Sequence, residues 1–238
     1  MPLPPEQRIK FFVFVIESPS AVDLYQRRGE GEILQQAVRL NGIPCVVKTA
    51  ICLQAFEASL KIGLPEAMNQ VPGFTPLIHI SAHGFAEGIE LSNGEVIPWR
   101  ALKDFFRPIN QALNGSLVVC MSSCEGYAGI RMAMHVEDND LPFLAIVGCA
   151  GKPTWADTAV AYTAFYHQLY RGEHISVAVN AMQVASGNPL FFLEHAENSR
   201  VAYLEYINAS NPANAQAALE QRLDQEPPEH LGNLKALS

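Results

Sequence analysis

Two residues of this chain have side chains that can act together as a nucleophile and its base: Cys124 and His83. Each follows an apolar run typical of a buried β-strand, and each is followed within two residues by a glycine. If the two strands are neighbours in a parallel sheet, the thiol and the imidazole project into one crevice from adjacent loops. The imidazole can then take the thiol proton and leave a thiolate ready to attack.

Gly84 directly follows His83 and lets the backbone approach a substrate closely. Its N–H and that of Cys124 can together hold the oxyanion of a tetrahedral intermediate. A single Cys or His at a strand end is more often structural, so the prediction depends on the pairing of the two strand ends. His79 lies four residues before His83 on a predicted strand, which lacks the helical spacing of a metal-binding HExxH motif.

The elements that must position these residues alternate between strand and helix. Residues 8–16 form a continuous apolar run, as expected of a strand buried on both faces. Further strands are predicted over residues 43–48, 76–81, 116–121, 142–148 and 201–207. Helices are predicted over residues 32–40, 53–62 (ended by Gly63 and Pro65), 99–113, 157–170, 175–185 and 214–223. This pattern predicts an α/β fold with a mainly parallel sheet and helices on both faces.

Two segments depart from the alternation. Residues 88–98 contain Asn93-Gly94 between short alternating runs, which predicts a hairpin with a type I′ turn. From residue 208 onward the composition becomes polar, so we expect one domain over residues 1–207 and a polar extension over residues 208–238.

Composition excludes several classes of protein. The 238 residues are 49% hydrophobic and carry a net charge of −8, which argues for a packed core and against nucleic-acid or anionic-membrane binding. Apolar runs are shorter than a membrane span, the N-terminus lacks the pattern of a signal peptide, and no phosphate-binding glycine motif occurs. Five cysteines without zinc spacing predict a reducing, cytoplasmic setting, with neither metal nor cofactor.

Three segments taken together resemble the caspase-like (clan CD) cysteine peptidases: LIHISAHG, the hairpin GIELSNGEVI, and LVVCMSSCEG. In that clan one hydrophobic strand ends in His-Gly and a later one ends in a small residue and the nucleophilic Cys. Here His83-Gly84 and Ser123-Cys124 stand 41 residues apart in that order. Over residues 8–187 the chain is most similar to a free-standing CHAT domain. The resemblance implies a caspase-like three-layer sandwich and peptide hydrolysis, with Cys124 as nucleophile, His83 as base and acid, and Gly84 in the oxyanion hole.

The sequence alone leaves the substrate specificity and the binding partners undecided. Arg27 or Arg28 can recognise an acidic substrate side chain, as an arginine in this region does in caspases, or can be an ordinary surface residue. Trp155 can wall the substrate cleft, while Asp157 either favours a basic substrate residue or caps the helix that follows it. No long linker of the caspase maturation type follows Cys124; residues 137–140 read as a short solvated loop. The resemblance also implies a protein substrate, a separate activator or sensor, and a bacterial stress or defence setting.

Two alternatives remain. Ser122-x-Cys124-x-Gly126 loosely resembles the nucleophile elbow of glutamine amidotransferase-like proteins, but that elbow begins with Gly and its His follows the Cys. A catalytically silent caspase-like scaffold is the second alternative, and thiol reactivity distinguishes it from an enzyme.

Overall fold

The computed structural model of the chain describes residues 8–136 and 140–210. Its centre is a sheet in the order β2-β1-β3-β6-β7-β8, and β4 and β5 extend it from β3. The strands from β2 to β7 on this path are parallel, and β8 alone among them runs antiparallel to its neighbour. Their bounds are β1 Phe11–Ser18, β2 Cys45–Thr49, β3 Thr75–Phe85, β6 Val118–Ser122, β7 Ala145–Cys149 and β8 Phe191–His195.

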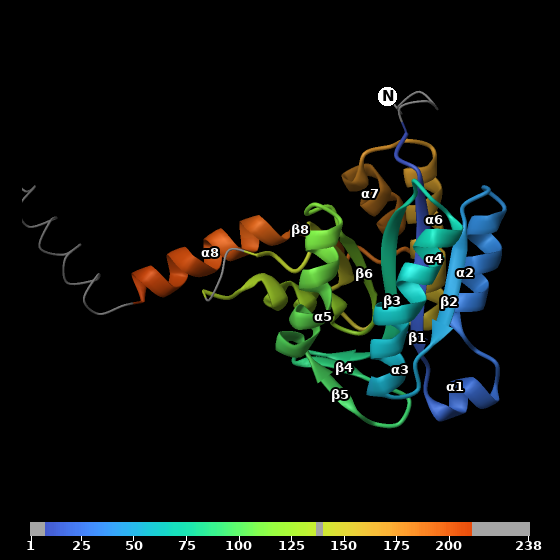
Figure 1. The fold of residues 1–238 in the computed structure, drawn as a ribbon, viewed down its shortest axis with the longest axis horizontal. Helices are drawn as coiled ribbons and strands as arrows, with labels where there is room; N and C mark the ends of the chain where they lie inside the picture. Colours follow the sequence, from blue (N-terminus) through green and yellow to red (C-terminus); the bar gives the residue numbers. More distant parts are fainter. Residues whose placement is uncertain (1–7, 137–139, 211–238) are drawn as a thin grey trace, which may run out of the picture. The chain divides into compact units, whose positions relative to one another are not determined.

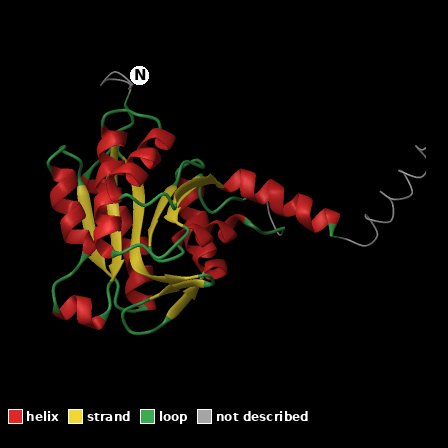
Figure 2. Ribbon diagram, turned by 180° about the vertical axis from the view of Figure 1, so that it is seen from behind, coloured by secondary structure: helices red, strands yellow, loops and turns green. Residues whose placement is uncertain are grey.

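Helices cover both faces of this sheet, as the views from the two sides show (Figures 1 and 2). One face packs against α2 (Glu30–Arg39), α6 (Trp155–Tyr170) and α7 (Ile175–Ser186). The other packs against α3 (Leu53–Ala58), a π-helical turn (Ser59–Gly63), α4 (Leu64–Gln70) and α5 (Trp99–Ala112). Two apolar cores therefore lie above and below the strands, which confirms the predicted α/β class.

The alternation of side chains along β1 explains why its sequence is apolar throughout. Phe12, Phe14 and Ile16 belong to the core on the α5 side, whereas Val13 and Val15 belong to the core on the α6 side. Successive side chains point to opposite faces of a strand, so a strand covered on both faces needs an unbroken apolar run.

The predicted hairpin is present as β4 (Gly88–Glu90) and β5 (Val96–Pro98). Its turn differs from the prediction. Gly94 has a φ of 84°, but Asn93 is absent from the described residues with positive φ, and a type I′ turn needs positive φ at both central positions. The Asn93 side chain accepts a hydrogen bond from the N–H of Glu95. Backbone bonds from the Leu91 N–H to the Glu95 carbonyl oxygen and from the Gly94 N–H to the Leu91 carbonyl oxygen also close the loop.

Two other predictions of secondary structure were wrong, and one strand was missed. Gly63 and Pro65 do not end the second helical segment, because the chain passes through the π-helical turn and Pro65 sits in the first turn of α4, where its missing N–H is not needed. Residues 201–207 lie in helix α8 (Ala196–Ala209) rather than in a strand. The sheet's antiparallel strand is β8, which was not predicted.

The chain divides into two compact units, residues 1–200 and residues 201–238. In the second unit the structure describes residues 201–210, which are helical up to Ala209. The predicted helix over 214–223 and most of the predicted loop over 137–140 lie outside the described residues. Within the described ranges no helix is long and apolar enough to cross a membrane.

Candidate active site

His83 lies in the last part of β3, beyond the residues that pair with β6, and Cys124 lies in the loop that follows β6. These two segments are called the His83 loop and the Cys124 loop. The pairing of β3 with β6 places His79 opposite Cys120 and Ser81 opposite Ser122. His83 lies two residues beyond Ser81, still within β3, and Cys124 lies two residues beyond Ser122, in the turn that follows β6. Neighbouring strands lie ~4.8 Å apart, so this register brings the two loops together.

Backbone contact between the loops is close at Gly84. A Cβ atom built on Gly84 would overlap the carbonyl oxygen of Cys124 and lie 2.7 Å from Cβ of Ser123. Only a residue without a side chain fits against the nucleophile loop at this point. Glycine at this position is therefore a packing requirement of the two loops, in addition to the role in an oxyanion hole predicted for it.

His83 is exposed, with 48% of its side chain accessible, and two other elements border it. Its Nε2 lies 4.0 Å from Oδ2 of Asp23, which belongs to the short helix α1 (Ala21–Tyr25) after β1. On another side the ring of Trp155 meets the imidazole edge-on, with 6.0 Å between ring centroids. The carboxylate and the indole limit the directions in which the imidazole can turn. Figure 1 shows α1 and the β4–β5 hairpin at the same end of the sheet.

Cys124 is half-buried. Burial raises the pKa of its thiol above the ordinary value, and Glu125 raises it further, whereas Lys152 lowers it. The resting side chain is therefore a thiol, and a base is needed to remove its proton at the moment of attack. In the part of the chain that the structure describes, no hydrogen bond joins this thiol to His83.

The backbone directly after Cys124 adopts an uncommon conformation. Glu125 has a φ of 53°, in the left-handed region, and its N–H donates to the carbonyl oxygen of Gly151 at 2.7 Å. Gly126 follows, and a Cβ there would lie 2.6 Å from the carbonyl oxygen of Met121. These features turn the chain sharply off the end of β6 into the 3-10 helix η3 (Gly126–Ala133). Strained backbone of this kind is concentrated at functional sites.

A buried carboxylate lies beneath the two loops. Oε2 of Glu30, the first residue of α2, accepts hydrogen bonds from Oγ of Ser81 at 2.7 Å and from Oγ of Ser122 at 2.6 Å. Nε2 of His79 lies 3.6 Å from the same oxygen, and Nδ1 of His79 shares a hydrogen bond of 2.8 Å with the Tyr166 hydroxyl. The sequence analysis did not identify Glu30 or Asp23 as site residues.

Two of the predicted specificity residues, Arg28 and Asp157, have polar partners within the chain. Nε of Arg28 lies 3.6 Å from Oδ1 of Asp23, so its guanidinium neutralises the carboxylate that borders His83. Arg27 is exposed and has a φ of 53° at the end of α1. Asp157 forms the capping box of α6 with Thr154: its carboxylate accepts from the Thr154 N–H at 2.9 Å, and its own N–H donates to the Thr154 hydroxyl at 3.2 Å. The capping interpretation of Asp157 is therefore confirmed, and the box fixes the start of α6, where Trp155 stands.

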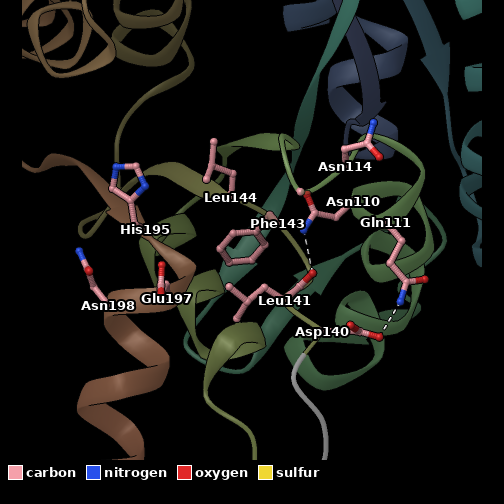
Figure 3. A pocket seen from close by; sticks show the side chains of 11 residues that line it. Asn110, Gln111, Asn114, Asp140, Leu141, Phe143, Leu144, His195, Glu197 and Asn198 are labelled. Atoms are coloured by element: carbon pink, nitrogen blue, oxygen red, sulfur yellow. Dashed lines mark hydrogen bonds between the residues drawn. The ribbon is translucent and has the colours of Figure 1, made fainter.

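Two further observations concern ligands. Within residues 8–136 and 140–210, no three His, Cys, Asp or Glu side chains come together in a way that would hold a metal ion. A cavity of about 660 Å³ lies away from the His83 and Cys124 loops, close to the N-terminal end of β7 (Figure 3). Asn110 borders it and donates a hydrogen bond of 2.8 Å to the Leu141 carbonyl oxygen.

Comparison with known proteins gives a structural match only. No model of a protein family matches the chain, and no curated protein matches its sequence. Among solved structures it is similar to a secreted C11 cysteine protease from Bacteroides thetaiotaomicron, determined by X-ray in complex with an irreversible peptide inhibitor. The TM-score is 0.54 at 6% sequence identity, over 79% of this chain and 67% of the protease chain. The chain has a caspase-like fold.

This similarity confirms that the fold is of the caspase-like type predicted from the sequence. The narrower similarity to CHAT domains stays a prediction, and so do the roles of His83, Gly84 and Cys124. The structure brings the loops of these three residues together with the predicted Trp155 and adds Asp23 and Glu30, which were not predicted.

Proposed function

We propose that this chain is a cysteine endopeptidase that hydrolyses peptide bonds through an acyl-enzyme on Cys124. The observation that carries the proposal is the register of β3 and β6, which brings the loops of an imidazole and a thiol together at the carboxyl ends of adjacent strands. The fold shared with a cysteine protease is a second support.

The reaction follows from the groups in these loops. His83 takes the proton from Sγ of Cys124, and the thiolate attacks the carbonyl carbon of the scissile bond. The N–H groups of Gly84 and Cys124 stabilise the negative charge on the carbonyl oxygen. The imidazolium then protonates the amine as the C–N bond breaks. His83 next deprotonates a water molecule, which attacks the thioester and releases the carboxylic acid and the Cys124 thiol.

Asp23 fits the role of the group that orients the base. Its carboxylate faces Nε2 of His83 and is itself held by the Ser20 hydroxyl at 2.6 Å and by Arg28. An imidazole oriented at Nε2 presents Nδ1 to the thiol, which is the arrangement that a nucleophile, base and orienting group require.

The setting of the enzyme belongs to the same proposal. A CHAT-type peptidase in the bacterial cytoplasm would act on a protein substrate in a stress or defence response, after a separate activator or sensor switches it on. The raised pKa of the Cys124 thiol supports a resting enzyme of low reactivity. In this proposal Arg27 or Arg28 contacts an acidic residue before the cut, and Trp155 walls the cleft. Asp157, whose carboxylate caps α6, contacts a basic residue only if it leaves the capping box.

The direct test is cleavage of a proteome-derived peptide library, read by mass spectrometry. We expect cuts with the wild type and with Cys52→Ala, a matched change at a second half-buried cysteine, and none with Cys124→Ala or His83→Ala. Removal of either dyad residue should lower turnover by several orders of magnitude. Equal cutting by wild type and Cys124→Ala would refute the proposal.

The silent scaffold is the second candidate, because the imidazole faces Asp23 and is not hydrogen-bonded to the thiol in the described residues. A scaffold predicts no cuts, and alkylation of Cys124 that does not depend on His83. A latent enzyme also gives no cuts with the isolated chain, but its Cys124 loses reactivity on His83→Ala.

A further inference from the structure

The Glu30 carboxylate lies where the pairing of β3 and β6 ends. The last paired residues of the two strands are Ser81 and Ser122, and both donate their hydroxyl protons to one atom, Oε2 of Glu30. The distances of 2.7 and 2.6 Å are within the range of good hydrogen bonds between oxygen atoms. Glu30 thus joins the two strands through their side chains at the level where the backbone ladder stops.

Burying the Glu30 side chain in this arrangement costs free energy. The Glu30 side chain has no accessible surface, and neither its Oε1 nor Nε2 of His79 has a hydrogen-bond partner within the described residues. Taking a carboxylate out of water costs several kcal/mol, and apolar side chains of similar volume would avoid that cost. Stability alone is therefore a poor explanation for a glutamate at this place.

Its position relative to the site offers another explanation. Each serine stands two residues before a proposed catalytic residue, Ser81 before His83 and Ser122 before Cys124. Beyond the serines β3 turns to pair with β4, and β6 has ended. The spacing of the two loops is thus set at the serine pair.

We infer that Glu30 is a positioning residue that, by binding Ser81 and Ser122 through one oxygen atom, sets the separation of the loops bearing His83 and Cys124. This inference rests on the proposed function for its turnover readout, but the reactivity of the thiol tests it without any substrate. An error of about 1 Å in the placement of reacting groups lowers turnover by ~100-fold, so a loosened serine pair affects kcat more than KM.

The test compares wild type with Glu30→Gln, Ser81→Ala and Ser122→Ala. Glutamine keeps the shape but replaces one carboxylate oxygen with an amide NH2, which donates hydrogen bonds and does not accept them. We expect kcat to fall by about tenfold or more with KM within about twofold. We also expect the alkylation rate of Cys124, measured by mass spectrometry relative to Cys52 in the same molecule, to change by at least about threefold. The double variant Glu30→Gln/Ser122→Ala should show less than the sum of the single effects, because both changes remove one interaction.

Asn110→Ala is the matched control for loss of a buried polar bridge. The Asn110 amide accepts from the Leu117 N–H at 3.0 Å and donates to the Leu141 carbonyl oxygen, close to the opposite end of β6 (Figure 3). It should lower the thermal midpoint and leave kcat and Cys124 reactivity as in the wild type.

The inference is overturned if the Glu30 and serine variants behave like Asn110→Ala, with a lower thermal midpoint but unchanged kcat and unchanged Cys124 alkylation. If Glu30→Gln fails to fold, the two serine variants decide, since each removes a single hydrogen bond. If the wild type cleaves no peptide, the alkylation rates still decide whether Glu30 positions the thiol, and the proposed function fails only if Cys124 alkylation is also unchanged by His83→Ala.

Discussion

Gly84→Ala is a perturbation whose effect can be worked out from the structure. The new methyl group would overlap the carbonyl oxygen of Cys124 and lie 2.7 Å from Cβ of Ser123. Carbon atoms pack at ~3.5–4.0 Å, so the two loops must separate by about 1 Å. The N–H of residue 84 is retained, which means that any loss of activity comes from displacement and not from a missing oxyanion donor.

Two magnitudes follow from this displacement. Overpacking of a closely packed site costs about 1–3 kcal/mol of folding free energy. In a domain of roughly 200 residues that lowers the thermal midpoint by about 2–12 °C. A shift of about 1 Å between the nucleophile loop and the base loop lowers turnover by about 100-fold.

Gly88→Ala provides the matched control. A Cβ on Gly88 would overlap the carbonyl oxygen of Ile97 and lie 2.8 Å from Cα of Pro98, so the overlap is with backbone of the β4–β5 hairpin. Both variants should lose similar stability in thermal unfolding, but only Gly84→Ala should lose most of its peptide cleavage. Full cleavage by Gly84→Ala, or equal loss by both variants, would contradict the close contact between the two loops on which the reasoning depends.

Four further outcomes are expected. Burial raises the pKa of the Cys45 thiol to about 12, so the fold favours the protonated form; this stabilisation is complete below pH ~8.5 and is lost as pH rises to about 12. In Cys45→Ala the thermal midpoint should therefore fall less steeply at alkaline pH than in the wild type. The same pH dependence in both would argue against this contribution of the Cys45 thiol. Lys152 lowers the pKa of Cys124, so Lys152→Ala should move the pH profile of Cys124 alkylation to higher pH; a move to lower pH would reverse the sign assigned to Lys152. Asp23→Asn should lower turnover by less than about tenfold, because the imidazole it faces is half exposed and 4.0 Å away, and a loss of several orders of magnitude would make Asp23 indispensable. Thr154→Ala removes a capping box and should lower stability by about 1 kcal/mol in chemical denaturation, unless α6 is held by packing alone.

The parallel strands could be predicted because burial on both faces of the sheet requires apolar residues along their whole length. Phe12 and Val13 face opposite cores, and a strand buried on both faces has to be apolar at every position. β8 gave no such pattern, since its side chains after Phe191 are only partly buried and its pairing with β7 defines it as a strand. Residues 201–207 are rich in β-forming types, yet Val201, Leu204 and Ile207 also recur every three residues, which fits the helix observed.

The site could be predicted where its geometry follows from strand register. The loops of His83 and Cys124 were expected to meet because each follows a buried strand, and the two strands are neighbours. Glu30 and Asp23 were missed because they lie in and beside a polar turn after β1, where local sequence does not show which charged residue turns inward. Their partners are far along the chain: Ser81 is 51 residues and Ser122 is 92 residues from Glu30. Contacts between residues so far apart in the sequence form only when the whole chain is folded, so local sequence does not predict them.

The register of β3 against β6 also limits how the chain can change in length. A strand repeats every two residues, so deleting one residue between Val118 and Ser122 would turn the Ser122 hydroxyl away from Glu30 to the opposite face of the sheet. A deletion of two residues would keep the face but draw the thiol back by ~6.6 Å. The β4–β5 hairpin has no such restriction, because it begins beyond Ser81 and Ser122, the last pair of residues between β3 and β6. Insertions and deletions among relatives of this chain should therefore accumulate between Leu91 and Glu95 and be absent from β3 and β6.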